Sequence, residues 1–117
     1  MLDFRTEHIL ETTVVRVTGE VDLGNAKMLE RELLQRATNN HLILDLSGLA
    51  YLDLSGVRAL EAVQAFCQAH DRAIVLANPS LPLRRLFDLI DLGQRMLIFD
   101  SRERALAHFQ PNTGNPR

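Results

Sequence analysis

Two short apolar segments separated by one amphipathic segment constrain the fold of this chain more than any other feature. Residues 42–46 are aliphatic apart from Asp45, and residues 73–77 are aliphatic throughout. Short apolar runs flanked by polar residues are typical of strands buried in a sheet. Between them, in residues 57–70, apolar side chains recur at the spacing of one helix face. A strand, a helix and a strand of these lengths imply a right-handed crossover between parallel strands.

The rest of the chain extends this pattern in both directions. Residues 2–9 alternate weakly and residues 12–18 are rich in β-branched types, so the short link between them predicts an antiparallel hairpin. Further elements are predicted as a helix over residues 26–37 capped by Asn25, a helix capped by Ser80, a strand over residues 96–99, and a last helix that is capped by Asp100 or Ser101 and ends at Phe109.

The expected order is therefore β-β-α-β-α-β-α-β-α. It predicts an α/β domain over residues 1–110, with a mixed sheet of about five strands and four helices mainly on one face. Residues 111–117 have the composition of a disordered tail.

Charge and cysteine content argue against several functional classes. The 13 basic and 15 acidic residues give a net charge of -2, which argues against nucleic acid as a partner. No apolar run is long enough to cross a bilayer, and the first residues lack the order of a signal peptide, so we expect a cytoplasmic protein without direct membrane insertion. The single Cys67 cannot form an internal disulfide, which is consistent with a reducing compartment.

The segment Asp53-Leu54-Ser55-Gly56 follows the first apolar strand and opens the next helix. Ser55 is expected at or near the helix N-terminus, where unpaired N–H groups and the helix dipole favour negative charge. Its hydroxyl could simply cap the helix, and a phosphate carried on it would also be held there. Asp53 brings a fixed negative charge close to the same hydroxyl, so phosphorylation of Ser55 would act as a charge switch.

Other chemistries fit the sequence poorly. A nucleophile elbow needs glycines where Asp53 and Val57 stand, and the histidines His41 and His70 are expected far from the serine that a catalytic triad would use. No histidines or cysteines have metal-ligand spacing. Residues 19–24 have the glycine spacing of a phosphate loop, but the Lys-Ser/Thr pair that should follow is missing. We therefore expect no enzymatic activity, no metal and no cofactor.

Five short motifs follow one another in order across residues 2–109. They are Gly19-Glu20-Val21-Asp22 with Asn25-Ala26, Leu44-Asp45-Leu46-Ser47-Gly48-Leu49, Asp53-Leu54-Ser55-Gly56-Val57, Asn78-Pro79-Ser80, and Arg84-Arg85-Leu86-Phe87-Asp88. As an ordered set, these motifs resemble the STAS domain, and within it the stand-alone bacterial anti-sigma factor antagonists.

The resemblance implies a phosphorylation-controlled partner switch. Ser55 matches the phosphoacceptor serine of the family's D-[ST]-[ST]-G motif, Asp53 matches its aspartate, and Asp22 matches an acidic residue of an earlier loop that lies nearby in the family fold. The unphosphorylated domain would bind an anti-sigma factor with serine kinase activity and so release a sigma factor. Phosphorylation would end this binding, and a protein phosphatase would restore it.

The predicted docking surface surrounds Ser55 and includes Asp22, Asp53, Leu54, Gly56, Arg58 and Glu61. Leu54 stands where the family motif has Ser or Thr, and we expect it to be the apolar anchor for a partner. The alternative is that Leu54 folds beneath the loop and contributes only to stability. A second functional class also stays open, namely a STAS subunit of a membrane transporter, such as a lipid-transport ABC system, that acts by packing without phosphorylation.

Overall fold

The computed structural model describes residues 1–110, so the predicted tail at 111–117 lies outside the described residues. The strands are β1 (Leu2–Ile9), β2 (Thr12–Val21), β3 (His41–Leu52), β4 (Ile74–Ala77) and β5 (Ile98–Phe99). The helices are α1 (Ala26–Arg36), α2 (Leu54–Ala69), α3 (Leu81–Leu89) and α4 (Arg102–Phe109), and a 3-10 turn, η1, spans Leu92–Gln94. The predicted order of strands and α-helices is confirmed.

The five strands form one mixed sheet in the order β1-β2-β3-β4-β5. β1 pairs antiparallel with β2 through the predicted hairpin, and the other neighbouring strands pair in parallel. Each parallel pair is joined by a helix, as the apolar runs and amphipathic segments predict.

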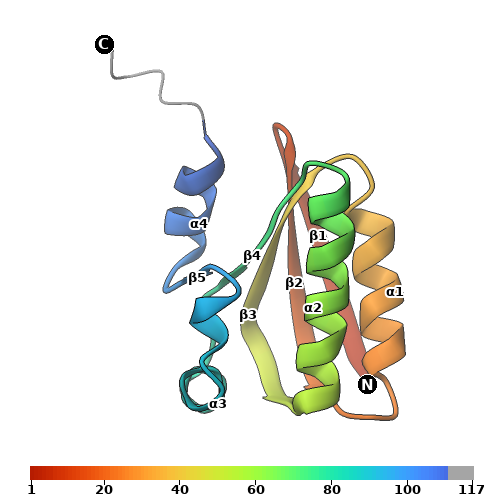
Figure 1. The fold of residues 1–117 in the computed structure, drawn as a ribbon, viewed down its shortest axis with the longest axis vertical. Coiled ribbons are helices and arrows are strands. Elements are labelled where there is room, and N and C mark those ends of the chain that lie inside the picture. The colour runs from red at the N-terminus through yellow and green to blue at the C-terminus, as the bar shows by residue number, and fades with distance from the viewer. Residues whose placement is uncertain (111–117) are drawn as a thin grey trace.

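The helices lie mainly on one face of the sheet, as expected. α1, α2 and α3 bury Leu29, Leu60 and Phe87 in one large core cluster with alternate residues of the strands. α4 packs on the opposite face through a smaller cluster around Ile43 and Ala105. Figure 1 shows α1 and α2 side by side over the long strands, with α4 set apart from them.

The third strand is longer than the sequence predicts. β3 continues through Leu52 because its second half pairs with the end of β2, after two irregularities in the register. A side chain at Gly48 would come within 2.7 Å of the Thr18 hydroxyl, so this close pairing requires glycine there. Only Asp53 separates β3 from α2, and the predicted loop is therefore a one-residue link that holds Ser55 on a rigid element.

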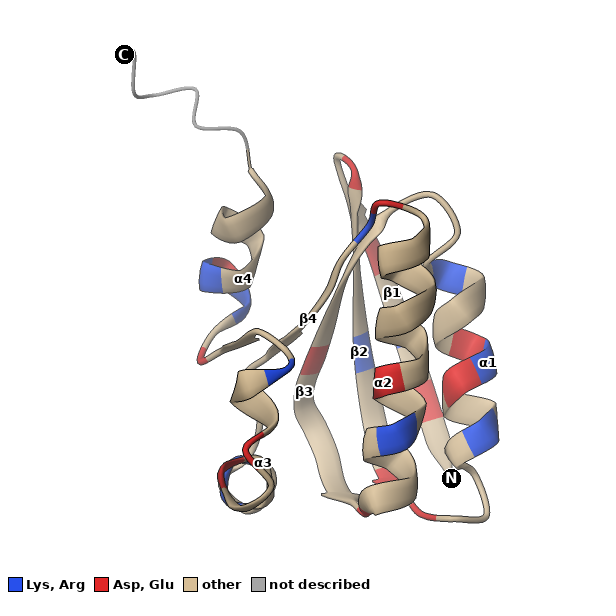
Figure 2. Ribbon diagram, in the orientation of Figure 1, with Lys and Arg blue, Asp and Glu red and all other residues tan. Residues whose placement is uncertain are grey.

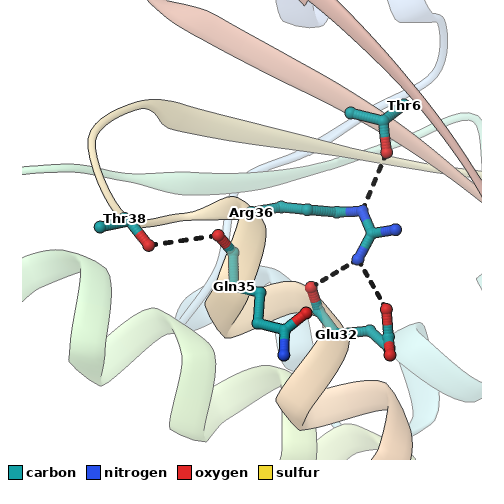
Figure 3. A network of polar contacts seen from close by, with 5 residues as sticks. All are labelled: Thr6, Glu32, Gln35, Arg36 and Thr38. Atoms are coloured by element: carbon teal, nitrogen blue, oxygen red, sulfur yellow. Dashed lines mark hydrogen bonds and ion pairs between the residues drawn. The ribbon is translucent and has the colours of Figure 1, made fainter.

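The edge strand β1 is tied to α1 by the polar network drawn in Figure 3. Arg36, at the end of α1, donates from Nε to the Thr6 hydroxyl at 2.9 Å and from Nη1 to the Glu32 carboxylate at 2.8 Å. Its guanidinium also lies 5.2 Å from the centre of the Phe4 ring, within the range of a cation–π contact. One side chain thus joins the last turn of α1 to the outermost strand.

Replacing Arg36 with methionine is expected to lower the free energy of unfolding by about 1–2 kcal/mol, because it removes hydrogen bonds to a hydroxyl and a carboxylate together with the contact over Phe4. Urea denaturation measures the change. Arg5→Met is the matched control, since the Arg5 guanidinium lies 3.8 Å from Asp3 with both side chains exposed. Equal stability of the two variants would show that the Arg36 network contributes nothing.

Candidate functional site

The start of α2 is organised by the carboxylate of Asp53, the N-cap residue. Its Oδ1 accepts hydrogen bonds from the backbone N–H of Ser55 at 3.0 Å and of Gly56 at 3.2 Å, and it also accepts one from the Ser55 hydroxyl. Ser55 is the second residue of the helix. The alternative that Ser55 caps the helix is therefore wrong, because Asp53 already satisfies the free N–H groups.

The same contacts set the charge of the site. The hydroxyl of Ser55 lowers the pKa of Asp53 by donating to its carboxylate, and the N–H groups of Gly56 and Ser55 act in the same direction. Asp53 is therefore ionised at neutral pH, directly beside the Ser55 hydroxyl. A second negative charge on Ser55 would be strongly opposed at its present position.

The loop after β2 lies against the start of α2. The N–H of Asp53 donates to the carbonyl of Val21 at 3.2 Å, which brings the residue before Asp22 next to the segment that contains Ser55. The Asp22 carboxylate accepts from the N–H of Gly24 at 2.9 Å and so stays within its own loop. Asp22 is thus the neighbour in sequence of Val21, which contacts Asp53 at the start of α2.

Asn25 stands at the N-cap position of α1, as predicted, but its side chain does not cap the helix. Its Oδ1 accepts from the N–H of Asp22 at 3.0 Å, and its Nδ2 donates to the carbonyl of Glu20 at 2.9 Å. Asn25 therefore fixes the shape of the loop that faces the start of α2.

Ser55 lies at a groove of about 460 Å³ between α1 and α2. The groove is lined by Leu23, Ala26, Lys27, Glu30, Leu54, Ser55, Arg58, Ala59 and Ala62. Leu54 is the first residue of α2, and its 54% exposure contradicts the alternative that it folds beneath a loop. It also lines a second hollow, between α2 and α3, so it forms a ridge between two depressions.

Sequence reasoning missed Leu23 on this surface. Leu23 is 82% exposed and lines the groove from the loop before α1, opposite Leu54. The available signal was an isolated leucine among polar loop residues, which a sequence alone does not place beside Ser55.

Arg58 and Glu61, the two charged residues of α2 predicted on the docking surface, have different surroundings. Arg58 lines the groove with Ser55. Glu61 instead binds Arg95, just after η1, with 2.8 Å between its Oε2 and the arginine Nε. Glu61 is therefore engaged in an ion pair away from the groove, while Arg58 lines the groove beside Ser55.

The histidines considered for a catalytic triad lie at other contacts of the fold. His41 stacks on Phe109 of α4 with the ring centres 4.6 Å apart, and His70 ends α2 against Phe66. Burial raises the pKa of the Cys67 thiol. Within residues 1–110, no group of three or more metal-binding side chains gathers, and no helix is long and apolar enough to cross a membrane.

Replacing Asp53 with alanine is expected to lower the melting temperature more than replacing it with asparagine, because asparagine keeps an oxygen that can accept from the Ser55 and Gly56 N–H groups. Thermal denaturation followed by circular dichroism compares the two variants. If Asp53→Ala melts at the same temperature as the parent, the carboxylate is not a functioning cap.

This architecture defines a class of protein: an α/β domain with a hairpin-led mixed sheet that presents a serine at the start of its central helix. The STAS domain family model matches residues 3–105, and the chain belongs to this family. The resemblance read from the motifs is thereby confirmed.

Individual relatives agree with the family assignment. The chain is 25% identical over 112 residues to an anti-sigma F factor antagonist of Paenibacillus polymyxa. The alignment covers 93% of this chain and 96% of that protein. The phosphorylated form of the Bacillus cell fate determinant SpoIIAA shares the fold with a TM-score of 0.67 at 24% identity, over 92% of this chain and 100% of that one.

A membrane protein also contains this fold. The murine anion transporter Slc26a9 matches with a TM-score of 0.74 at 21% identity, covering 87% of this chain but only 18% of the transporter. The fold alone therefore does not separate the two functional classes.

Proposed function

We propose that this protein is an anti-sigma factor antagonist that works in the cytoplasm as a phosphorylation-controlled partner switch. The observation that carries the proposal is the position of Ser55, whose hydroxyl is held by Asp53 at the edge of an open, partly apolar groove. The relative from Paenibacillus polymyxa, named an anti-sigma F factor antagonist and aligned over 93% of this chain, supports it. The protein is the substrate of the switch and catalyses nothing itself.

In the unphosphorylated state, the surface around Ser55 binds an anti-sigma factor that is also a serine kinase, and the sigma factor is released. Leu54 and Leu23 offer exposed apolar side chains on the two sides of the groove. Burying one leucine at an interface is worth up to about 1.5–3 kcal/mol. Two such anchors beside the phosphoacceptor let the partner bind and modify the same surface.

Phosphorylation ends this binding. The kinase transfers the γ-phosphoryl group of ATP to Ser55 Oγ: the new Oγ–P bond replaces the bond to ADP, and the hydroxyl proton passes to a base of the kinase or to solvent. The phosphate adds about -1.5 to -2 charge at pH 7. Exposed charges act over roughly 8–10 Å at ordinary salt, so a partner seated over Leu54 lies within its reach. A protein phosphatase restores binding by hydrolysing the phosphoserine.

The transporter alternative rests on the fold shared with Slc26a9. In that role the domain would act by packing against a transporter subunit, and Ser55 would not be modified. The phosphorylation assay below separates the two classes, because a transporter subunit needs no phosphoacceptor.

Ser55 is expected to be the sole phosphorylation site. The protein is incubated with ATP and its cognate anti-sigma kinase, and the modified peptide is mapped by mass spectrometry. The Ser55→Ala variant is expected to bind the kinase but to accept no phosphate. Phosphate on Ser47, Ser80 or Ser101, or none with a kinase that modifies another antagonist, would contradict the proposal.

Replacing Leu54 with alanine is expected to weaken binding of the kinase about tenfold or more, which corresponds to about 1.4 kcal/mol. Thermal stability should change little, because the Leu54 side chain is 54% exposed. Leu89→Ala is the matched control, since Leu89 is 81% exposed at the end of α3. Titration calorimetry measures the affinity of both variants for the kinase. An equal loss of affinity in the two variants would show that Leu54 is not an anchor.

A further inference from the structure

The groove beside Ser55 is lined by two positively charged side chains. An apolar anchor of a partner would have no use for them. Lys27 lines it from α1 and Arg58 lines it from α2, against a single lining carboxylate, Glu30. The Lys27 ammonium lies 3.9 Å from Glu30, with 92% of the lysine side chain exposed. In the described part of the chain, Arg58 lies within 4 Å of no carboxylate. The groove therefore has an excess of positive charge next to the phosphoacceptor.

The geometry places these cations within reach of a group on Ser55. Ser55 and Arg58 are three residues apart on α2, so their Cβ atoms are about 5–6 Å apart on one side of the helix. Lys27 approaches from the second residue of α1, across the groove. Figure 2 shows a basic segment near the start of each of these two helices, at the same end of the molecule.

A phosphate on Ser55 cannot keep the present contact with Asp53. Phosphorylation replaces the hydroxyl proton that Ser55 now donates to the Asp53 carboxylate. The phosphate would then face a carboxylate whose charge is fixed by the N–H groups of Ser55 and Gly56. Repulsion from Asp53 favours a rotation of the phosphate away from the cap, and the groove that Ser55 lines is also lined by the cations Lys27 and Arg58.

We propose that the phosphate on Ser55 turns into the groove between α1 and α2 and is held there by Arg58, with Lys27 as a second cation. This inference rests on the proposed phosphorylation of Ser55 and concerns its consequence. The phosphorylated protein then fills its own docking groove, and it neutralises the two cations that line that groove. Phosphorylation thus ends partner binding by occupying the site as well as by adding charge.

The test uses protein that carries phosphoserine at position 55 by genetic encoding during synthesis, so that no kinase is needed. Phosphorus NMR then follows the second pKa of the phosphate as pH is varied. A nearby cation favours the dianion, so Arg58→Gln is expected to raise this pKa by about 0.3–0.5 units or more, and Lys27→Gln by less. Arg58→Lys keeps the charge and should stay close to the parent.

Arg85→Gln is the matched control, because Arg85 is exposed on α3 and does not line the groove. The second pKa should be unchanged in this variant. The inference is overturned if Arg58→Gln leaves the phosphate pKa at the parent value, or if Arg85→Gln shifts it as much as Arg58→Gln does. This titration involves no partner, whereas the kinase assay decides the proposed function, so the two can fail separately.

Discussion

Replacing Gly56 with valine is expected to lower the free energy of unfolding by about 2–3 kcal/mol, because overpacking a filled core costs this much. A Cβ atom at Gly56 would lie 2.8 Å from Cγ1 of Val21 and would also contact Cδ1 of Leu52. Val21 is fully buried and Leu52 is only 4% exposed, so neither side chain has free space to enter. Valine would push the first turn of α2 away from the sheet.

The same substitution is expected to abolish phosphorylation by the kinase, since Ser55 is the neighbour of Gly56 in that turn. Urea denaturation measures the stability, and the kinase assay measures the second effect. Gly93→Val is the matched control, because a Cβ at Gly93 meets nothing within 4 Å; its stability should lie within about 0.5 kcal/mol of the parent. A Gly56→Val variant as stable as the control would show that α2 does not need glycine at this contact.

Replacing Arg102 with methionine is expected to cost about 2–3 kcal/mol, since it removes the partner of a buried carboxylate. Arg102, the first residue of α4, binds Asp45 of β3 at 3.0 Å and Glu7 of β1 at 2.8 Å. The Asp45 side chain is only 7% exposed, and without Arg102 its carboxylate loses its cationic partner and keeps contacts from the neighbouring Ser47, whose N–H donates at 2.9 Å. The matched control is Arg104→Met, because the Arg104–Asp100 pair is 3.9 Å long and exposed, and its loss should cost less than about 1 kcal/mol.

The effect of Arg102→Met should depend on pH. Burial raises the pKa of Asp45, but the hydrogen bonds from Ser47 and Arg102 outweigh it and hold this pKa below the ordinary value. The contribution of the ionised carboxylate is therefore fully present above about pH 4 and is lost as the pH falls through the lower folded-state pKa. Denaturation of the parent and the variant at neutral pH and below pH 4 measures this. A stability difference that does not shrink in acid would contradict the role of the Asp45–Arg102 pair.

The order of elements could be predicted from sequence because each buried strand and each helix carries its own apolar period. The ends of the strands, by contrast, depend on pairing between strands that are far apart in sequence. The strand predicted at residues 42–46 extends to Leu52 because the end of β2 continues to pair with it beyond Gly48. The local sequence Ser47-Gly48 does not predict that the strand continues, because serine and glycine together are typical of a turn.

The residues at the centre of the candidate site could be predicted from sequence, but the groove beside them could not. Ser55 and Asp53 were found from their place between a strand and a helix, yet Asp53 rather than Ser55 caps the helix. Whether the serine or the aspartate caps the helix depends on the residue at which the helix begins. Helix boundaries are defined only to within one or two residues, so the sequence does not decide between the two caps. The groove needs α1 and α2 to be packed side by side, so Lys27 and Leu23 could not be assigned to the site from sequence.

The most direct test of the switch is the affinity of the cognate anti-sigma kinase for two forms of this protein, with serine or with encoded phosphoserine at position 55. Titration calorimetry without ATP keeps the two forms fixed during the measurement. The phosphorylated form is expected to bind at least tenfold more weakly, a difference of about 1.4 kcal/mol or more. Equal affinities for the two forms would contradict the switch.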